Sequence, residues 1–300
     1  MRYGPSQRMA SAKAELILVG IAQDGGIPQA GCACNRCKIA ISNPSKSLYP
    51  VSCIIRGVDG SVHLLEATRS ISHQLGMAAR SLDIGDSLIP DSVCLTHAHL
   101  GHIDGLGQFG KEAMGLRQIP LFASHSVTTV LGERGLLGPF QLNEKGPGEV
   151  FSPSEECGFD YEFIQVPHRD EYSDTHAIKI SGPKYNVLFL PDHDSWGQTL
   201  GLVGEKSVMS WFQTLSIDFA LVDGTFWSRE ELSDRDFSQV PHPTITRSLE
   251  LLGRRKEGDP EIIFVHLNHT NPVLDKDGKQ RKEVSERGWS IGEQGSIIEL

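Results

Sequence analysis

The chain has 300 residues, of which 39% are hydrophobic and 22% are charged, so it can form one large domain with a substantial core. Its formal net charge is -10 and it has no lysine- or arginine-rich run, which argues against a broad binding surface for duplex DNA or an anionic membrane. A small phosphorylated substrate remains compatible with this charge, because a bound metal ion can supply local positive charge.

The first residues, 1–14, are polar and lack the apolar middle of a secretory signal. No apolar stretch in the chain approaches the roughly 20 residues that are needed to span a bilayer. We therefore expect a disordered tail over residues 1–14 and a single domain over residues 15–300. We also expect a cytoplasmic protein without a membrane partner.

Short apolar runs, separated by glycine, proline, aspartate and serine, predict strands along the whole chain. The predicted strands are residues 15–21, 52–56, 62–66, 93–96, 120–123, 161–166, 175–181, 187–190, 219–222, 262–265 and 296–299. The predicted helices are residues 106–115, 127–133, 206–215, 243–252 and 279–287. Residues 135–151, rich in glycine, are expected to form a flexible loop near a site. Strands grouped in both halves, with helices between them, favour an α/β fold of two packed sheets with helices outside.

Three cysteines, Cys32, Cys34 and Cys37, lie close together near the N-terminus. In a chain of this size without an export signal, clustered cysteines bind metal more often than they form disulfides. Three thiolates at this spacing are typical of a structural zinc site that lacks its fourth ligand. A redox pair is the alternative, although Cys-x-Cys-x-x-Cys differs from the usual Cys-x-x-Cys motif.

Three histidines, His97, His99 and His102, follow directly after a predicted apolar strand. Residues two apart in an extended loop can converge on one cation, and the third histidine can reach a neighbouring point. Neutral imidazole is a good ligand for zinc and similar divalent ions. A lone histidine is more often a surface or core residue, but this cluster favours a metal site.

Three later apolar strands each lead into a residue that can bind metal, namely His168, Asp192 and His266. Each alone is a weak signal, since an aspartate after a strand is usually a turn residue. Together they favour a metal site along one rim of two packed sheets, because such a site takes its ligands from the carboxyl ends of several strands.

The segment Thr96-His-Ala-His-Leu-Gly-His102 resembles the metal-binding signature of the metallo-β-lactamase fold superfamily, and the later single ligands follow in that family's order. Within the superfamily the chain is most similar to the pyrroloquinoline quinone biosynthesis protein B (PqqB) group. Residues 22–29, 223–227 and 266–275 support this similarity. The resemblance implies an αββα sandwich.

The resemblance also implies two neighbouring metal sites. His97, His99 and His168 would form the first, and His102, Asp192 and His266 would form the second, with Asp192 bridging the two. Zinc, manganese or iron would occupy them, as one ion or two. Two such ions can activate a shared water molecule and polarise the bond under attack.

Gly101 departs from the superfamily pattern, which has an aspartate directly before the third histidine. Because glycine has no side chain to donate, we expect the second ion to be weakly held, differently chosen or absent. Asp104 could replace the missing ligand only if the loop rearranged. A Gly101→Asp substitution is therefore expected to raise occupancy of the second site. Asp24, in the first glycine-rich turn, is expected to face the site as well.

Further histidines gain a role through resemblance to phosphodiesterases of the carbon–phosphorus lyase pathway. Those proteins pair a cysteine trio with a histidine at the position of His269, which would complete the structural zinc site. They also place an acid and a His-x-Thr element beside the metals, so His242 would protonate the leaving oxygen and Asp223 would orient its ring. The alternative is that His242 merely precedes an ordinary helix start, with Thr244 as the cap.

These features favour a metal-dependent hydrolase acting on a small molecule, in which a metal-bound water attacks an ester-type bond, above all a phosphodiester. One alternative is an iron-dependent oxidative or accessory role in the biosynthesis of pyrroloquinoline quinone or a related compound. Another is a zinc-binding protein without catalysis. No nucleic-acid partner is expected, and a homodimer is compatible with the resemblance.

Overall fold

The computed structural model describes residues 13–82, 84, 88–232 and 240–300. Residues 1–12 of the predicted tail lie outside these described residues. Ala14, at the end of that tail, is buried, and its carbonyl accepts a hydrogen bond from the backbone N–H of Leu300 at 2.9 Å. Within the described residues, no helix is both long enough and apolar enough to cross a membrane.

The first sheet has seven strands in the order β14-β1-β2-β3-β4-β5-β6. Their bounds are Ile297–Glu299 for β14, Glu15–Gly20 for β1, Ser52–Arg56 for β2, Val62–Leu65 for β3, Ser92–Cys94 for β4, Ile119–Ala123 for β5 and Phe140–Glu144 for β6. Neighbours from β14 to β3 pair antiparallel, and neighbours from β3 to β6 pair parallel.

The second sheet also has seven strands, in the order β13-β12-β11-β10-β9-β8-β7. Their bounds are Ser290–Ile291 for β13, Glu261–Val265 for β12, Phe219–Asp223 for β11, Asn186–Leu190 for β10, Thr175–Ser181 for β9, Asp160–Val166 for β8 and Val150–Phe151 for β7. Neighbours from β7 to β10 pair antiparallel, and neighbours from β10 to β13 pair parallel.

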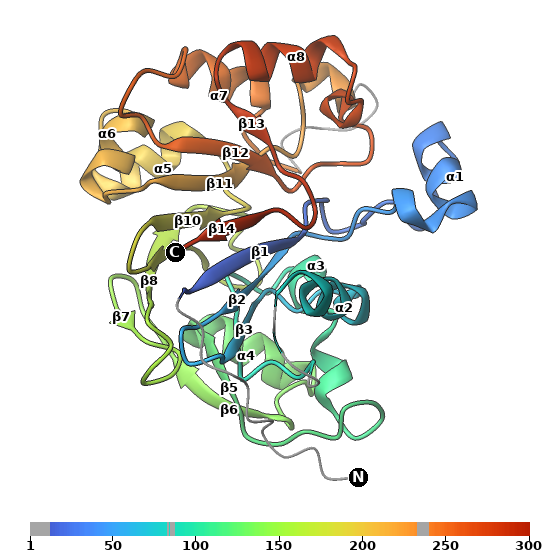
Figure 1. The fold of residues 1–300 in the computed structure, drawn as a ribbon, viewed down its shortest axis with the longest axis vertical. Coiled ribbons are helices and arrows are strands. Elements are labelled where there is room, and N and C mark those ends of the chain that lie inside the picture. The colour runs from blue at the N-terminus through green and yellow to red at the C-terminus, as the bar shows by residue number, and fades with distance from the viewer. Residues whose placement is uncertain (1–12, 83, 85–87, 233–239) are drawn as a thin grey trace.

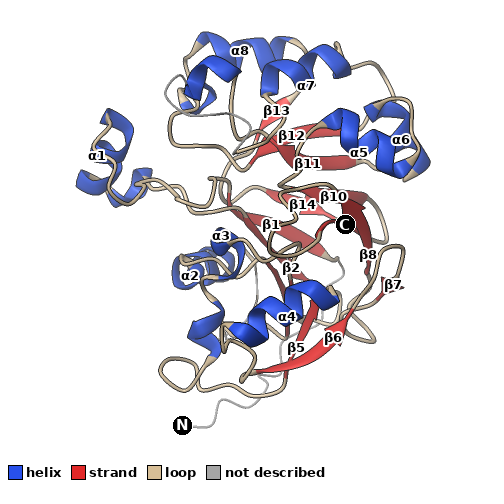
Figure 2. Ribbon diagram, turned by 180° about the vertical axis from the view of Figure 1, so that it is seen from behind, coloured by secondary structure: helices blue, strands red, loops and turns tan. Residues whose placement is uncertain are grey.

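Helices cover the outer faces of both sheets (Figures 1 and 2). Those beside the first sheet are α2 (Ile71–Ser81), α3 (Leu100–Ile103) and α4 (His125–Glu133). Those beside the second are α5 (Trp196–Val203), α6 (Val208–Thr214), α7 (Ile245–Leu252) and α8 (Lys279–Glu286). In both views α1 (Asn35–Ser42) lies apart from these layers. The predicted α/β sandwich of two packed sheets with outer helices is confirmed.

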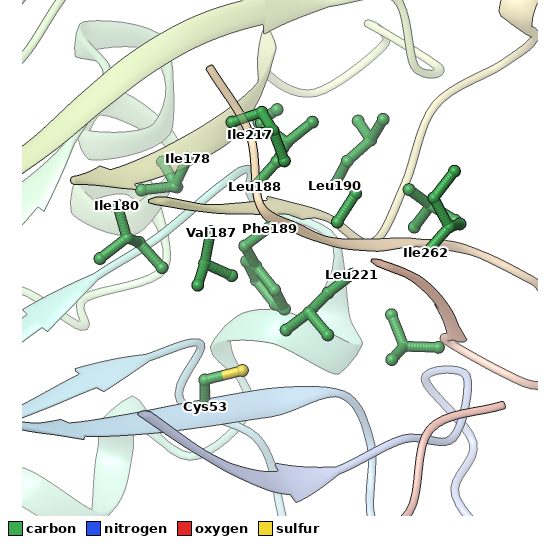
Figure 3. Close-up of a cluster of buried hydrophobic side chains, with 14 of the residues drawn as sticks. Cys53, Ile178, Ile180, Val187, Leu188, Phe189, Leu190, Ile217, Leu221 and Ile262 are labelled. Atoms are coloured by element: carbon green, nitrogen blue, oxygen red, sulfur yellow. The ribbon is translucent and has the colours of Figure 1, made fainter. Parts of the chain in front are cut away.

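The core between the sheets follows from the alternation of side chains along each strand. In β10, Val187 and Phe189 point toward the first sheet, where they approach Cys53 of β2 (Figure 3). Leu188 and Leu190 point to the opposite side of the strand (Figure 3). The four apolar side chains of β10, from Val187 to Leu190, are fully buried, as expected for a strand that is covered on both faces.

Two of the predicted elements are wrong. Residues 135–151 contain β6 and β7, the edge strands through which the chain passes from the first sheet to the second, so they are not a free loop. The predicted helix over residues 106–115 is reduced to a 3₁₀ helix over Leu106–Phe109. Glycine is a poor helix former, and Gly110 and Gly115 follow this short helix, with a φ of 65° at Gly115.

Candidate metal centre

The segments that follow β4, β8, β10 and β12 converge at one place. The loop after β4 and the short helix α3 carry three histidines, and the other three segments each carry one further ligand. Four overlapping sets of side chains have ligand atoms within 4.8 Å of one another. These sets are His97, His99 and His168; His97, His102 and Asp192; Asp24, His102 and His266; and Asp192, Asp223, His242 and His266. The structure therefore brings all six predicted ligands together and adds Asp24 to them.

Asp192 lies between the two predicted groups of ligands. Its Oδ2 is 3.1 Å from Nε2 of His102, and its Oδ1 is 3.6 Å from Nε2 of His168. Two atoms bound to one tetrahedral ion at about 2.0–2.1 Å lie roughly 3.3 Å apart, so both distances suit shared coordination. Burial opposes ionisation of Asp192, but the neighbouring His266 and His102 outweigh it and hold the pKa of this carboxyl well below its usual value.

The histidines present one ring nitrogen to the centre and the other to a fixed partner. Nδ1 lies 2.8 Å from Thr96 Oγ1 in His97, 3.4 Å from Glu66 Oε2 in His102, 3.3 Å from Asp194 Oδ1 in His168 and 2.8 Å from Thr225 Oγ1 in His266. The hydrogen bonds with Thr96 and Thr225 fix the tautomer and orientation of His97 and His266. Glu66 and Asp194 act on His102 and His168 through their charge, since Nδ1 of these two rings has no hydrogen-bond partner among the described residues. Within the described residues, the buried Nε2 of His97 has no hydrogen-bond partner, as suits an atom that awaits a cation.

The Glu66 carboxylate gives the first testable prediction. Glu66 is fully buried, its Oε1 accepts a hydrogen bond from the backbone N–H of Thr96 at 3.0 Å, and its Oε2 faces His102. We expect Glu66→Gln to weaken binding of the ion nearest His102 by about 10- to 100-fold, because the amide loses the charge that orients the ring. Competition with a chelating dye measures this. Unchanged affinity in a folded variant would exclude this role for Glu66.

A second pair, His242 and Asp223, lies beside the ligands although the two residues are distant in sequence. Nδ1 of His242 is 2.7 Å from Asp223 Oδ2, and both side chains are buried. Thr225 supports the carboxylate, since its backbone N–H and hydroxyl donate to Asp223 Oδ1 at 3.0 and 2.7 Å. Burial disfavours the imidazolium of His242, but the Asp223 charge and hydrogen bond outweigh it and raise the pKa of His242.

The two interpretations of the segment from His242 to Thr244 are compatible with each other. The Thr244 side chain caps α7 by accepting a hydrogen bond from the backbone N–H of Arg247. His242, two residues earlier, pairs with Asp223 and also lines a cavity of about 620 Å³. Arg229, Arg247 and Asp194 line the same cavity, and Arg247 also pairs with Glu250 at 2.8 Å.

The neighbourhood of Gly101 differs from expectation. A Cβ on Gly101 would lie 2.4 Å from Asp24 Oδ1 and 2.6 Å from Asp24 Cα. Real Cβ atoms do not approach that closely, so Gly101→Asp has no room for its side chain while Asp24 is present, contrary to the expected gain in occupancy. Asp104 does not replace the missing ligand either, because its carboxylate pairs with Arg69 at 3.2 Å.

The cysteine cluster forms a separate group with His269. Sγ of Cys32, Cys34 and Cys37 lies 3.6, 3.7 and 3.8 Å from His269 Nδ1. A sulfur bound at about 2.3 Å and a nitrogen at about 2.0–2.1 Å of one tetrahedral zinc lie roughly 3.6 Å apart, so the spacing suits zinc. Burial opposes ionisation of Cys34, but hydrogen bonds from the Cys37 backbone and from His269 lower its pKa to about 6.

Residues 78–267 match the family model for the beta-lactamase superfamily domain, and the chain belongs to this family. Over almost its full length it is similar to Coenzyme PQQ synthesis protein B. The version from Azoarcus sp. strain BH72 is 29% identical over 310 residues, which cover 94% of this chain and 99% of that protein.

Two solved structures share the fold. Zn²⁺-bound PqqB from Methylobacterium extorquens has a TM-score of 0.70 at 20% identity and covers 95% of this chain and 100% of its own. A diphosphatase from the PhnP family has a TM-score of 0.65 at 20% identity and covers 96% of this chain and 97% of its own. The predicted resemblance to the metallo-β-lactamase superfamily and its PqqB-like group is confirmed.

Proposed function

We propose that the protein is a metal-dependent hydrolase of small molecules that cleaves an ester-type bond, a phosphodiester above all. One observation carries the proposal. Asp192 lies between two groups of histidines, within 3.1 Å of His102 and 3.6 Å of His168, with a buried histidine–aspartate pair alongside. Zinc, manganese or iron held by these groups would lower the pKa of water and polarise the bond under attack. At the separate cysteine cluster we propose a structural zinc.

Side chains beside the metal ligands would protonate the leaving group and bind the substrate. His242 holds a proton on Nδ1 against Asp223 at 2.7 Å, which orients the ring so that Nε2 can protonate the departing oxygen. Arg229 and Arg247, on the wall of the cavity beside His242, would attract an anionic group of the substrate. Asp192, Asp223 and His242 are therefore the residues to which we assign the reaction.

The direct test is hydrolysis of a chromogenic bis-aryl phosphodiester by protein loaded in turn with zinc, manganese and iron. We expect turnover with at least one metal and none after chelation. The corresponding phosphomonoester serves as a control for contaminating phosphatases. No turnover with any divalent metal would contradict the phosphodiesterase proposal.

A second candidate function is an iron-dependent oxidative or accessory step in the biosynthesis of pyrroloquinoline quinone or a related compound. It is favoured by the similarity to Coenzyme PQQ synthesis protein B over 94% of this chain. Metal analysis of protein purified without added metal separates the two candidates. Zinc or manganese at the histidine centre would support hydrolysis, and iron would support oxidation.

A further inference from the structure

We infer that Asp24, from the glycine-rich turn after β1, is the carboxylate ligand of the second metal site. The inference rests on the proposed metal centre and names the residue that completes it. In the superfamily pattern this carboxylate comes from the position of Gly101. Here the ligand reaches the same point from another segment of the chain, and the glycine makes room for it.

The distances around Asp24 support this assignment. Its Oδ1 lies 3.2 Å from Nε2 of His266 and 3.4 Å from Nε2 of His102. Both separations match those expected for ligands of one tetrahedral ion, roughly 3.3 Å. The outer nitrogens of both histidines face Thr225 and Glu66, so Nε2 is the atom that each ring offers to the ion. Asp192 Oδ2, at 3.1 Å from Nε2 of His102, would join Asp24 as a second carboxylate at this site.

The backbone holds Asp24 in this place. Ala22 forms a parallel bridge to Leu267, and the N–H of Gln23 donates to the carbonyl of Leu267 at 2.9 Å. Leu267 follows His266 directly, so the two ligands are positioned by a shared piece of backbone. The N–H of Gly26 closes the turn on the Gln23 carbonyl at 2.7 Å, with a φ of 66° that suits glycine. A ligand positioned in this way loses little conformational entropy on binding.

Gly101 leaves the space that the Asp24 carboxylate occupies. The nearest atoms to a Cβ at that position would be Asp24 Oδ1, Cγ and Cα, all at 2.4–2.6 Å. A side chain at position 101 and the carboxylate of Asp24 therefore exclude each other. The absence of an aspartate at position 101 does not leave the second site a ligand short.

The test counts bound ions in the full-length protein with Co²⁺ as the probe. Cobalt thiolate absorption reports the cysteine site, and the weaker visible bands report the histidine centre. We expect three ions in the wild-type protein, one at the cysteines and two at the centre. Asp24→Asn should weaken the second ion at the centre by about 100-fold or more and leave the cysteine site unchanged. Asp104→Asn, a neighbouring carboxylate paired with Arg69, is the matched control and should retain all three ions.

Substitutions at position 101 test whether a side chain there and Asp24 exclude each other. Gly101→Asp alone should lower stability without adding an ion. Asp24→Gly with Gly101→Asp should not regain the second ion either, because Cα of residue 24 would still lie 2.6 Å from the new Cβ. Wild-type affinity in Asp24→Asn, or a wild-type protein that never binds a second ion at the centre, would overturn the inference. If the ion count behaves as expected but phosphodiesters are not cleaved, the inference stands and the proposed hydrolase activity fails.

Discussion

Replacing His242 with asparagine is expected to lower kcat for phosphodiesters with poor leaving groups by about 100- to 10,000-fold. The reason is that His242, held by Asp223 at 2.7 Å, would supply the proton that a strongly basic leaving oxygen requires. A nitrophenolate leaves without that help, so the loss should be much smaller for nitrophenyl esters. Rates for a series of leaving groups with increasing pKa measure this difference.

The metal content of His242→Asn should equal that of the wild-type protein, because Asp223 holds His242 as a proton donor at 2.7 Å and three of the four ligand sets at the centre do not include this histidine. His125→Asn, an exposed histidine with 83% of its side chain accessible, is the matched control and should keep full activity. The pH profile adds a readout, since the proton donor works below its pKa and Asp223 raises that pKa. Wild-type activity should therefore fall at high pH, and the variant should lack this limb. An equal loss for every leaving group would point to a structural role instead.

Loss of the proposed structural zinc is expected to be the largest effect on stability. Cys37 is fully buried and, with Cys32, Cys34 and His269, joins the start of α1 to the segment after β12. Zinc sites of this kind contribute on the order of 10 kcal/mol to folding in small zinc-binding peptides. For a chain of this size, Cys37→Ala should lower the unfolding midpoint by at least about 10 °C and remove one zinc per chain. Thermal unfolding and elemental analysis measure the two effects.

Cys157→Ala is the control for loss of a buried thiol that has no histidine partner. Cys157 is buried, and its thiol faces the carbonyls of Ser154 and Phe159 at 3.2 Å. This variant should lose some stability to the cavity but keep its zinc. Chelation should lower the unfolding midpoint of Cys157→Ala by more than that of Cys37→Ala, because both variants lose the ions of the histidine centre but only Cys157→Ala also has a structural zinc to lose. A Cys37→Ala protein that retains full zinc would contradict the proposed site.

The sequence was sufficient for the fold because most central strands contain a short apolar run that is bounded by clear breakers. β2 and β9 begin and end at the predicted residues, Ser52–Arg56 and Thr175–Ser181. Helix α2 was missed because Ser70 and Gly76 interrupt a weakly apolar segment, and its stability comes from Ile71, Leu75 and Ala78 packed on the first sheet.

At the site, the candidate metal ligands could be predicted because each one directly follows an apolar strand. Such a pattern is visible in the local sequence. Glu66 could not, because nothing in its own segment shows that a residue after β3 faces His102. The surroundings of Gly101 could not be predicted from the sequence for a related reason. A missing side chain is visible in sequence, but the residue that occupies its space comes from a distant turn and is brought there only by the pairing of Ala22 with Leu267.

The metal centre draws its ligands from both packed sheets: the loop after β4 belongs to the first, and Asp192 and His266 follow strands of the second. An ion bound there would cross-link two layers whose shared core is apolar. A ligand that binds only the folded state, present at a hundredfold excess over its dissociation constant, adds about 2.7 kcal/mol to the free energy of unfolding. Scarcity of the ion would thus shorten the lifetime of the chain against proteases as well as silence its chemistry, so abundance and activity would fall together.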